Sequence, residues 1–234
     1  MELSEKEKSI FDGLMLSDGN LSKTFKNARF SLTSKYKSFI EATINNLPSI
    51  SWGSTSEKDI YDKRTNKFYH SCRARSHVSE WLTVQYERWY PCGVKVVPKD
   101  IIINKDSFEW WYIGDGHLCR KKTRPNYRRI IMATDSFNKN DKTFLKDKLI
   151  NFLGNDVYIE NERTIVIAKD SLVKIAKMLK NPEIIDYAYK YDFGNYIYDN
   201  YHEMAMISRG PVGGRPKGSK DKTKRKKGIK YEQK

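Results

Sequence analysis

The sequence predicts an α+β protein built from two pseudo-symmetric halves, each with the element order αββαββα. One observation is a pair of stretches, residues 11–19 and 108–116, in which a mostly apolar helix runs into an Asp-Gly turn. Their aspartates, Asp18 and Asp115, stand 97 positions apart (115 minus 18), about the length of one half of the 234-residue chain. The other observation is that the same order of elements follows each stretch with almost no repeat of sequence, which indicates an old duplication.

The first half is expected to begin with a helix over residues 4–17, because Ser4 and Glu7 have the spacing of a capping box and apolar residues with helical periodicity follow. Alternation of apolar and polar residues predicts strands, and helical spacing predicts the helices between them. The elements expected after the first helix are a hairpin at 21–34, a helix at 34–47, strands at 49–61 and 68–75, and a helix at 78–89.

The second half repeats this order after a stretch at 91–98 that glycine and proline interrupt. Asn104 is the expected N-cap of its first helix. A basic segment then leads into a strand through residue 132, followed by a helix at 140–153, strands at 157–159 and 164–168, and a helix at 171–179. The predicted division is an N-terminal half at 1–94, a linker at 95–103, a C-terminal half at 104–204, and a basic, disordered tail at 205–234.

The net charge of +15 indicates a polyanionic partner, most often nucleic acid. From Arg209 onward eleven Lys and Arg against two acids give +9, so the other 208 residues still carry +6. Within the tail, Gly214-Arg215-Pro216 resembles the core of an AT-hook, a segment that fits the minor groove of A·T-rich DNA. A generic basic arm on phosphates and a tail without a role in DNA binding remain the alternatives.

The three cysteines and four histidines have no spacing typical of a metal site. Cys72, Cys92 and Cys119 are widely separated, so free thiols in a reducing compartment are expected in place of disulfides or zinc ligands. No apolar run reaches the ~18 residues that a transmembrane helix needs, and the N-terminus is no signal peptide. We expect an intracellular protein without membrane contact; a bacterial or phage cytoplasm and an organelle are not distinguished.

The two Asp-Gly turns predict a metal site. A carboxylate at a helix C-terminus faces the negative end of the helix dipole, which costs up to ~1 kcal/mol unless a cation neutralises it. If the two helices pack side by side, Asp18 and Asp115 meet at one pseudo-twofold axis. The arrangement therefore requires a cation between the halves.

Both stretches resemble the LAGLIDADG motif of homing endonucleases, in the form found in monomeric members. The first is similar to the variant xxGLxLSDG and the second to xxYWxxxDG, with Trp110 and Trp111 where the type sequence has Gly-Leu. Because tryptophan is much larger than glycine, this difference argues against very close backbone contact on one side of the helix pair. Three shorter matches follow in the family's order, namely Lys95-Val96-Val97-Pro98, Met132-Ala133-Thr134-Asp135-Ser136-Phe137 and Tyr189-Lys190.

The resemblance implies a monomeric, site-specific endonuclease that makes double-strand breaks in a long DNA target. Two or more Mg²⁺ ions, with Mn²⁺ as a substitute, would be held by Asp18, Asp115 and the main-chain carbonyls of Ser17 and Gly114, because Mg²⁺ prefers hard oxygen ligands. Lys95 and Lys190 would polarise the water network or stabilise the charge of the transition state.

The resemblance also implies a saddle-shaped antiparallel sheet in each half that lies along the major groove. Candidate DNA contacts are Lys23, Lys26, Arg29, Arg73, Arg75, Lys121, Lys122, Arg128, Arg129 and, in the tail, Arg215. Two other functions fit the same fold: an RNA-binding intron maturase, with intron RNA as the partner, and a DNA-binding regulator that has lost cleavage.

Overall fold

The structure, a computed structural model, confirms the α+β fold of two αββαββα halves. It describes residues 2–121, 124–179, 182 and 184–193, with the backbone alone at 121 and 124–127; the predicted tail and its Arg215 lie outside these residues. The first half contains α1 (Glu5–Leu16), β1 (Asn20–Thr24), β2 (Asn27–Ser34), α2 (Lys37–Asn46), β3 (Trp52–Asp62), β4 (Lys67–Ser76) and α3 (Glu80–Trp89). The second contains α4 (Lys105–Asp115), β5 (Gly116–Lys121), β6 (Arg124–Ala133), α5 (Lys139–Leu153), β7 (Val157–Glu160), β8 (Thr164–Ile167), α6 (Lys169–Met178) and the 3₁₀ helix η1 (Ile185–Lys190).

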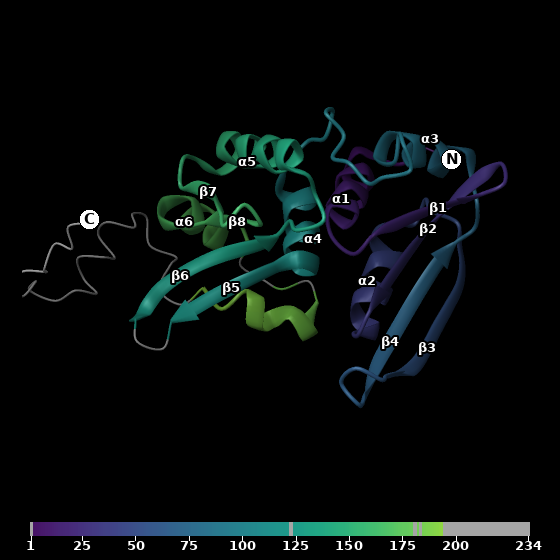
Figure 1. Cartoon of the computed structure of the whole chain (residues 1–234), viewed down its shortest axis with the longest axis horizontal. Coiled ribbons are helices and arrows are strands. Elements are labelled where there is room, and N and C mark those ends of the chain that lie inside the picture. Colours follow the sequence, from purple (N-terminus) through teal and green to yellow (C-terminus); the bar gives the residue numbers. More distant parts are fainter. Residues whose placement is uncertain (1, 122–123, 180–181, 183, 194–234) are drawn as a thin grey trace, which may run out of the picture.

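Each half holds one four-stranded antiparallel sheet, and the two sheets have matching strand orders, β1-β2-β4-β3 and β5-β6-β8-β7. Figure 1 shows α1 and α4 between the two sheets. The long hairpin of β3 and β4 extends away from this helix pair. No helix in the described part of the chain is long and apolar enough to span a membrane.

Capping boxes begin both central helices. Ser4 Oγ accepts the amide of Glu7, and the Glu7 carboxylate accepts the amide of Ser4 in return. Glu7 is only 7% exposed, and burial would raise its pKa, but hydrogen bonds from Ser4 and Ser49 outweigh burial and lower the pKa to about 2. At α4, Asn104 and Ser107 form the equivalent pair, which confirms Asn104 as the N-cap.

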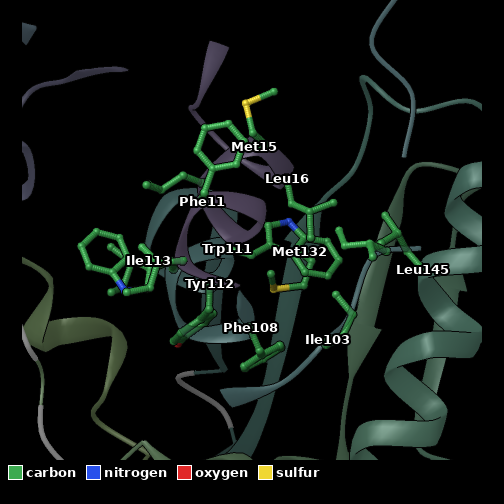
Figure 2. Close-up of a cluster of buried hydrophobic side chains, with 14 of the residues drawn as sticks. Phe11, Met15, Leu16, Ile103, Phe108, Trp111, Tyr112, Ile113, Met132 and Leu145 are labelled. Carbon is green, nitrogen blue, oxygen red and sulfur yellow. The ribbon is translucent and has the colours of Figure 1, made fainter. Parts of the chain in front are cut away.

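The helices α1 and α4 approach each other closely enough to need small residues at two positions. A Cβ on Gly13 would lie 2.3 Å from the carbonyl oxygen of Ser107, and a Cβ on Gly114 would lie 2.4 Å from Ser17 Oγ. One glycine at each crossing point therefore suffices, and Trp110 does not prevent close contact. Around this seam, side chains of both helices, including Phe11 and Trp111, form one buried cluster (Figure 2).

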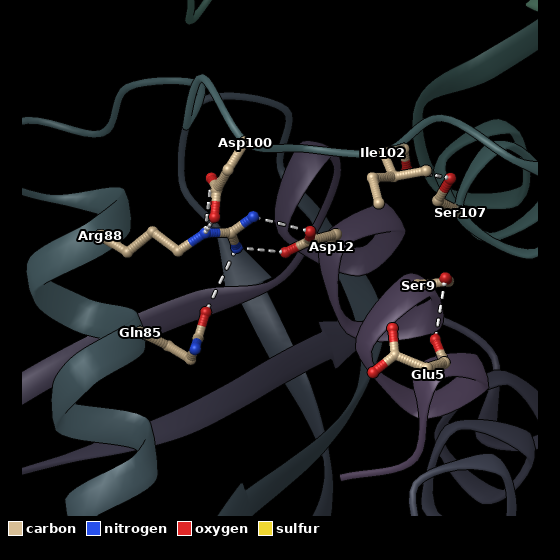
Figure 3. A network of polar contacts seen from close by, with 8 residues as sticks. All are labelled: Glu5, Ser9, Asp12, Gln85, Arg88, Asp100, Ile102 and Ser107. Atoms are coloured by element: carbon tan, nitrogen blue, oxygen red, sulfur yellow. Dashed lines mark hydrogen bonds and ion pairs between the residues drawn. The ribbon is translucent and has the colours of Figure 1, made fainter.

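A network around Arg88 ties α3 and the connector between the halves to α1 (Figure 3). The guanidinium of Arg88 donates to both carboxylate oxygens of Asp12, at 2.6 and 3.0 Å, and to both of Asp100, at 2.9 and 3.0 Å. Asp12 is 9% exposed, and breaking a buried ion pair typically costs ~3–5 kcal/mol because the remaining charge is left uncompensated. The network thus fixes both ends of the segment that carries Lys95.

The glycines after the two aspartates are required for space. Gly116 has a φ of −83°, which any residue can adopt, so it does not supply the left-handed conformation usual for a glycine at a helix end. A Cβ there would meet the ring of Tyr112 at 2.0 Å, and one on Gly19 would meet the carbonyl oxygen of Leu14 at 2.7 Å. The Asp-Gly pairs in the sequence mark these helix ends, and it is the lack of space for a side chain that accounts for the two glycines.

Candidate functional site

Four charged side chains converge where α1 and α4 end. Asp18 follows α1, and Asp115 is the last residue of α4. The Oδ2 of Asp18 lies 3.2 Å from the position that a Cβ on Gly114 would occupy, so the first acid reaches the end of the second helix. The other two groups, Lys95 from the connector and Lys190 from η1, face both aspartates electrostatically. The structure therefore brings together all four predicted catalytic residues.

The two aspartates are held in an environment that opposes their ionisation. Partial burial raises the pKa of Asp115 to about 6, the negative charge of Asp18 adds to this rise, and Lys95 and Lys190 counteract it. Asp18 keeps a solvent-exposed edge, yet the surrounding protein reduces its hydration enough to raise its pKa as well, against the two lysines. Two carboxylates that resist ionisation side by side form a site that a cation would stabilise.

Both lysines donate to main-chain carbonyls, Lys190 at the end of α4 and Lys95 just after α1. Lys190 is 5% exposed, and its Nζ donates to the carbonyls of Ile113 at 2.5 Å and Gly114 at 3.2 Å. Lys95 Nζ donates to the carbonyl of Gly19 at 3.0 Å. Burial lowers the pKa of each ammonium group to about 8, while the two aspartates favour the charged form. Lys190 partly neutralises the negative end of the α4 dipole.

The residues present fit a hard divalent cation. Two carboxylates and the nearby main-chain carbonyls of Ser17 and Gly114 are oxygen donors, which Mg²⁺ prefers. The Gly114 carbonyl also accepts a hydrogen bond from Lys190, at 3.2 Å. The side chain of Ser17 is turned to the helix, where its Oγ donates to the carbonyls of Gly13 and Leu14.

Two tyrosines that the sequence analysis did not single out fix the position of Lys190. Tyr112 Oη donates to the main-chain carbonyl of Lys190 at 2.5 Å, and the ring of Tyr187 lies with its centroid 5.0 Å from Lys190 Nζ. Burial raises the pKa of Tyr187 to about 12, so its hydroxyl stays protonated. In the sequence, the only signal for this packing is the spacing of the tyrosines in residues 187–191, most of which belong to the 3₁₀ helix η1.

Three predicted DNA contacts share the face of the first sheet that is turned away from its helices. Arg73 and Arg75 are the cross-strand partners of Thr33 and Ser31, and Arg29 lies two residues before Ser31, so all three side chains project to one side. Burial, followed by the charge of Arg75, lowers the pKa of Arg73. Among the residues that the structure describes, Arg73 Nε has no hydrogen-bond partner. Neither Arg73 nor Arg75 has an acidic partner there. A polyanion would supply the hydrogen-bond acceptors and negative charges that these guanidinium groups lack.

The remaining candidates are placed differently. Arg129 lies on the face of the second sheet that carries Ile131 and Val166, and pairs with Glu160 at 2.6 Å. Arg128 is in register with Arg120, which contacts η1 on the opposite face, and Lys23 pairs with Glu87 of α3 on the helix side of its sheet. Lys26 is exposed in the turn between β1 and β2. Lys122, Arg215 and the side chain of Lys121 lie outside the described part of the chain.

Comparisons with known proteins find one similar sequence and several similar structures. An uncharacterized protein of Methanocaldococcus jannaschii, MJ1098, is 28% identical over 161 residues, which cover 68% of this chain and 61% of that protein. The homing endonuclease I-WcaI bound to its DNA recognition sequence has the same fold, with a TM-score of 0.71 at 17% identity over 83% of this chain and 89% of that one. I-SmaMI bound to cleaved DNA matches with a TM-score of 0.47 at 12% identity, over 92% and 98% of the two chains.

A family model described as the LAGLIDADG DNA endonuclease family matches residues 8–174, a span that includes both Asp-Gly turns, Lys95 and both sheets. The chain therefore belongs to the LAGLIDADG DNA endonuclease family.

Proposed function

We propose that this protein is a Mg²⁺-dependent endonuclease that cuts both strands of a specific DNA site as a monomer. The observation that carries the proposal is the convergence of Asp18 and Asp115, one from each half, with Lys95 and Lys190 at the ends of α1 and α4. One acid from each half supplies one centre for each strand. Arg73 and Arg75 of the first sheet, which have no acidic partner in the part of the chain that the structure describes, support DNA as the partner, since each phosphate contact releases counterions.

The two aspartates would hold the metal, with the carbonyls of Ser17 and Gly114 close by. Bound Mg²⁺ supplies activation of water and neutralisation of charge on the scissile phosphate. Lys95 and Lys190 are anchored to main-chain carbonyls, so their ammonium groups are positioned before DNA binds. In that position they donate hydrogen bonds to ordered water or to phosphate oxygens whose charge grows in the transition state.

The test is cleavage of a randomised DNA library in Mg²⁺ and, separately, in Mn²⁺. The wild type should select sites that carry double-strand breaks, and Asp18→Asn and Asp115→Asn should each lower the cleavage rate by at least ~100-fold. Asp147→Asn, at an exposed acid of α5, is the matched control and should cut at the wild-type rate.

DNA binding without Mg²⁺-dependent cutting would contradict the proposal and favour a regulator. A gel shift with intron transcript, in the same buffer, separates the maturase from that outcome, because only the maturase should bind the transcript more tightly than a random RNA of equal length.

A further inference from the structure

A cluster of metal-binding side chains lies on the β3–β4 hairpin, apart from the two aspartates. It consists of Glu57, His70 and Cys72, whose ligand atoms all lie within 4.8 Å of one another. His70 Nε2 is 3.2 Å from Glu57 Oε1 and 3.3 Å from Cys72 Sγ. The sequence does not reveal this cluster because Glu57 joins the other two only through the strand register that pairs Glu57 with Cys72 and Asp59 with His70.

The imidazole of His70 is oriented by a second carboxylate. His70 Nδ1 lies 2.9 Å from Asp59 Oδ1, and a carboxylate can only accept, so we assign the proton of the neutral ring to Nδ1. The lone pair of Nε2 then points toward Glu57 and Cys72. A histidine whose far nitrogen donates to a carboxylate is the usual partner arrangement of a metal-ligating imidazole.

We propose that Glu57, His70 and Cys72 bind a divalent transition-metal ion, with Zn²⁺ as the probe, and that Asp59 positions His70 for it. The donor set of one sulfur, one imidazole nitrogen and one carboxylate oxygen suits Zn²⁺ and disfavours Mg²⁺. Tetrahedral ligands at ~2.0–2.3 Å from zinc are ~3.3–3.7 Å apart, close to the two separations measured from His70 Nε2. Water would complete the fourth position.

The site has an entry path. A groove between α2 and the β3–β4 hairpin is lined by Lys37, Glu41, Glu57 and Cys72, which gives an ion access to the otherwise buried sulfur. Burial and then the charge of Glu57 raise the pKa of the Cys72 thiol, so it holds its proton in the free protein. Metal binding would release this proton to solvent as the sulfur–metal bond forms.

A metal ion at this site would cross-link two strands of the first sheet. Glu57 is on β3 and the other two ligands are on β4, so a bound ion ties the strands together near the exposed end of the hairpin. The adjacent residue Arg73 projects from the opposite face of the same strand. It is one of the three arginines of the first sheet that we propose contact DNA. The site does not involve Asp18 or Asp115, so metal binding by Glu57, His70 and Cys72 can be tested independently of DNA cleavage.

The test is titration of the untagged full chain with Co²⁺ under reducing conditions, in which a thiolate ligand gives a near-ultraviolet charge-transfer band. The wild type should show the band, Zn²⁺ should abolish it by competition, and Cys72→Ser should lack it. Cys92→Ser, at an exposed cysteine, is the matched control and should retain it. Asp59→Asn should keep the band but weaken Co²⁺ affinity ~10–100-fold, as expected for a positioning residue.

Zn²⁺ should also raise the Tm of the wild type and of Cys92→Ser, and should raise that of His70→Gln by less, because this variant keeps only the site at Asp18 and Asp115. His70 has a 44% exposed side chain, so this variant should fold even if Cys72→Ser does not. The proposal is overturned if no band forms, if the band persists in Cys72→Ser, or if it disappears in Cys92→Ser.

Discussion

At the scale of single residues, the two aspartates of the candidate site lie in an environment that destabilises the fold. Asp115 ends a helix, lies near Asp18 and is partly removed from water, and all three conditions disfavour a carboxylate. Lys95 and Lys190 compensate only in part, since the pKa of Asp115 remains near 6. This unfavourable environment supports the proposal that Asp115 binds a cation.

Asp115→Asn should therefore stabilise the metal-free protein. The folded-state pKa of about 6 exceeds the unfolded value of 3.8, so the folded state binds more protons and stability falls as pH rises between these values. Above pH 6 the variant should be more stable by ~1 kcal/mol, discounted for partial exposure, or ~2–4 °C in Tm. The difference should vanish near pH 4; thermal melts in chelator that give equal Tm values at every pH would contradict it.

Glu7 is the opposite case, an acid that stabilises the fold. Its pKa of about 2 in the folded protein lies below the ordinary value of 4.5, so its contribution is complete above pH 4.5 and is lost as pH falls toward 2. Glu7→Gln should cost ~1–3 kcal/mol at pH 7, because buried hydrogen bonds from Ser4 and Ser49 lose their charged acceptor. Glu5→Gln, at the exposed acid of the same first turn, should cost under ~0.5 kcal/mol in the same denaturant titration.

At the scale of elements, the pairing of α1 with α4 positions the acids, and small residues control it. Gly13 faces a main-chain oxygen that belongs to the other helix and cannot rotate away. Gly114 faces Ser17, which occupies the matching place in the first motif, 97 positions earlier (114 minus 17). The two crossing points therefore differ in how they can adapt.

Gly13→Ala should destabilise the protein by ~1–3 kcal/mol through overpacking. Gly114→Ala should cost a similar amount alone, but Ser17→Gly in the same chain should restore most of it, because it removes the side chain that the new methyl group meets. Urea titration of the single and double variants measures this coupling. A double variant no more stable than Gly114→Ala would show that the contact does not limit helix spacing.

The sequence predicted the elements well because their signals are local. Capping residues, alternation and periodicity located the helices and strands within a few residues, and the two Asp-Gly turns located the acids. Contacts between elements left no local signal: the Arg88 network joins residues 12, 88 and 100, and the Glu57 cluster depends on strand register. Alternation over residues 27–34 separates an inward face, with Ala28 and Phe30, from a polar, basic face that carries Arg29, and the burial of these side chains confirms this separation.

At the scale of the whole molecule, two similar sheets flank one helix pair (Figure 1), and positive charge is distributed unequally over their faces. Arg29, Arg73 and Arg75 share the helix-free face of the first sheet, whereas Lys23 is paired with Glu87 on the covered face. Net charge alone would assign all four residues to the DNA. Their placement leaves only the three arginines as candidates for DNA contact.

This difference can be measured as a salt dependence. The logarithm of DNA affinity falls with the logarithm of salt concentration with a slope of about −0.9 for each phosphate neutralised. Arg73→Gln with Arg75→Gln should weaken binding to a random-sequence duplex and make that slope shallower by ~1–2, because these guanidiniums have no acidic partner among the described residues. Lys23→Gln removes one positive charge from the other face and should leave the slope unchanged, because Glu87 already neutralises Lys23. Gel shifts without divalent metal measure the slopes. If each positive charge removed changed the slope equally in the two variants, net charge and not the helix-free face would govern binding.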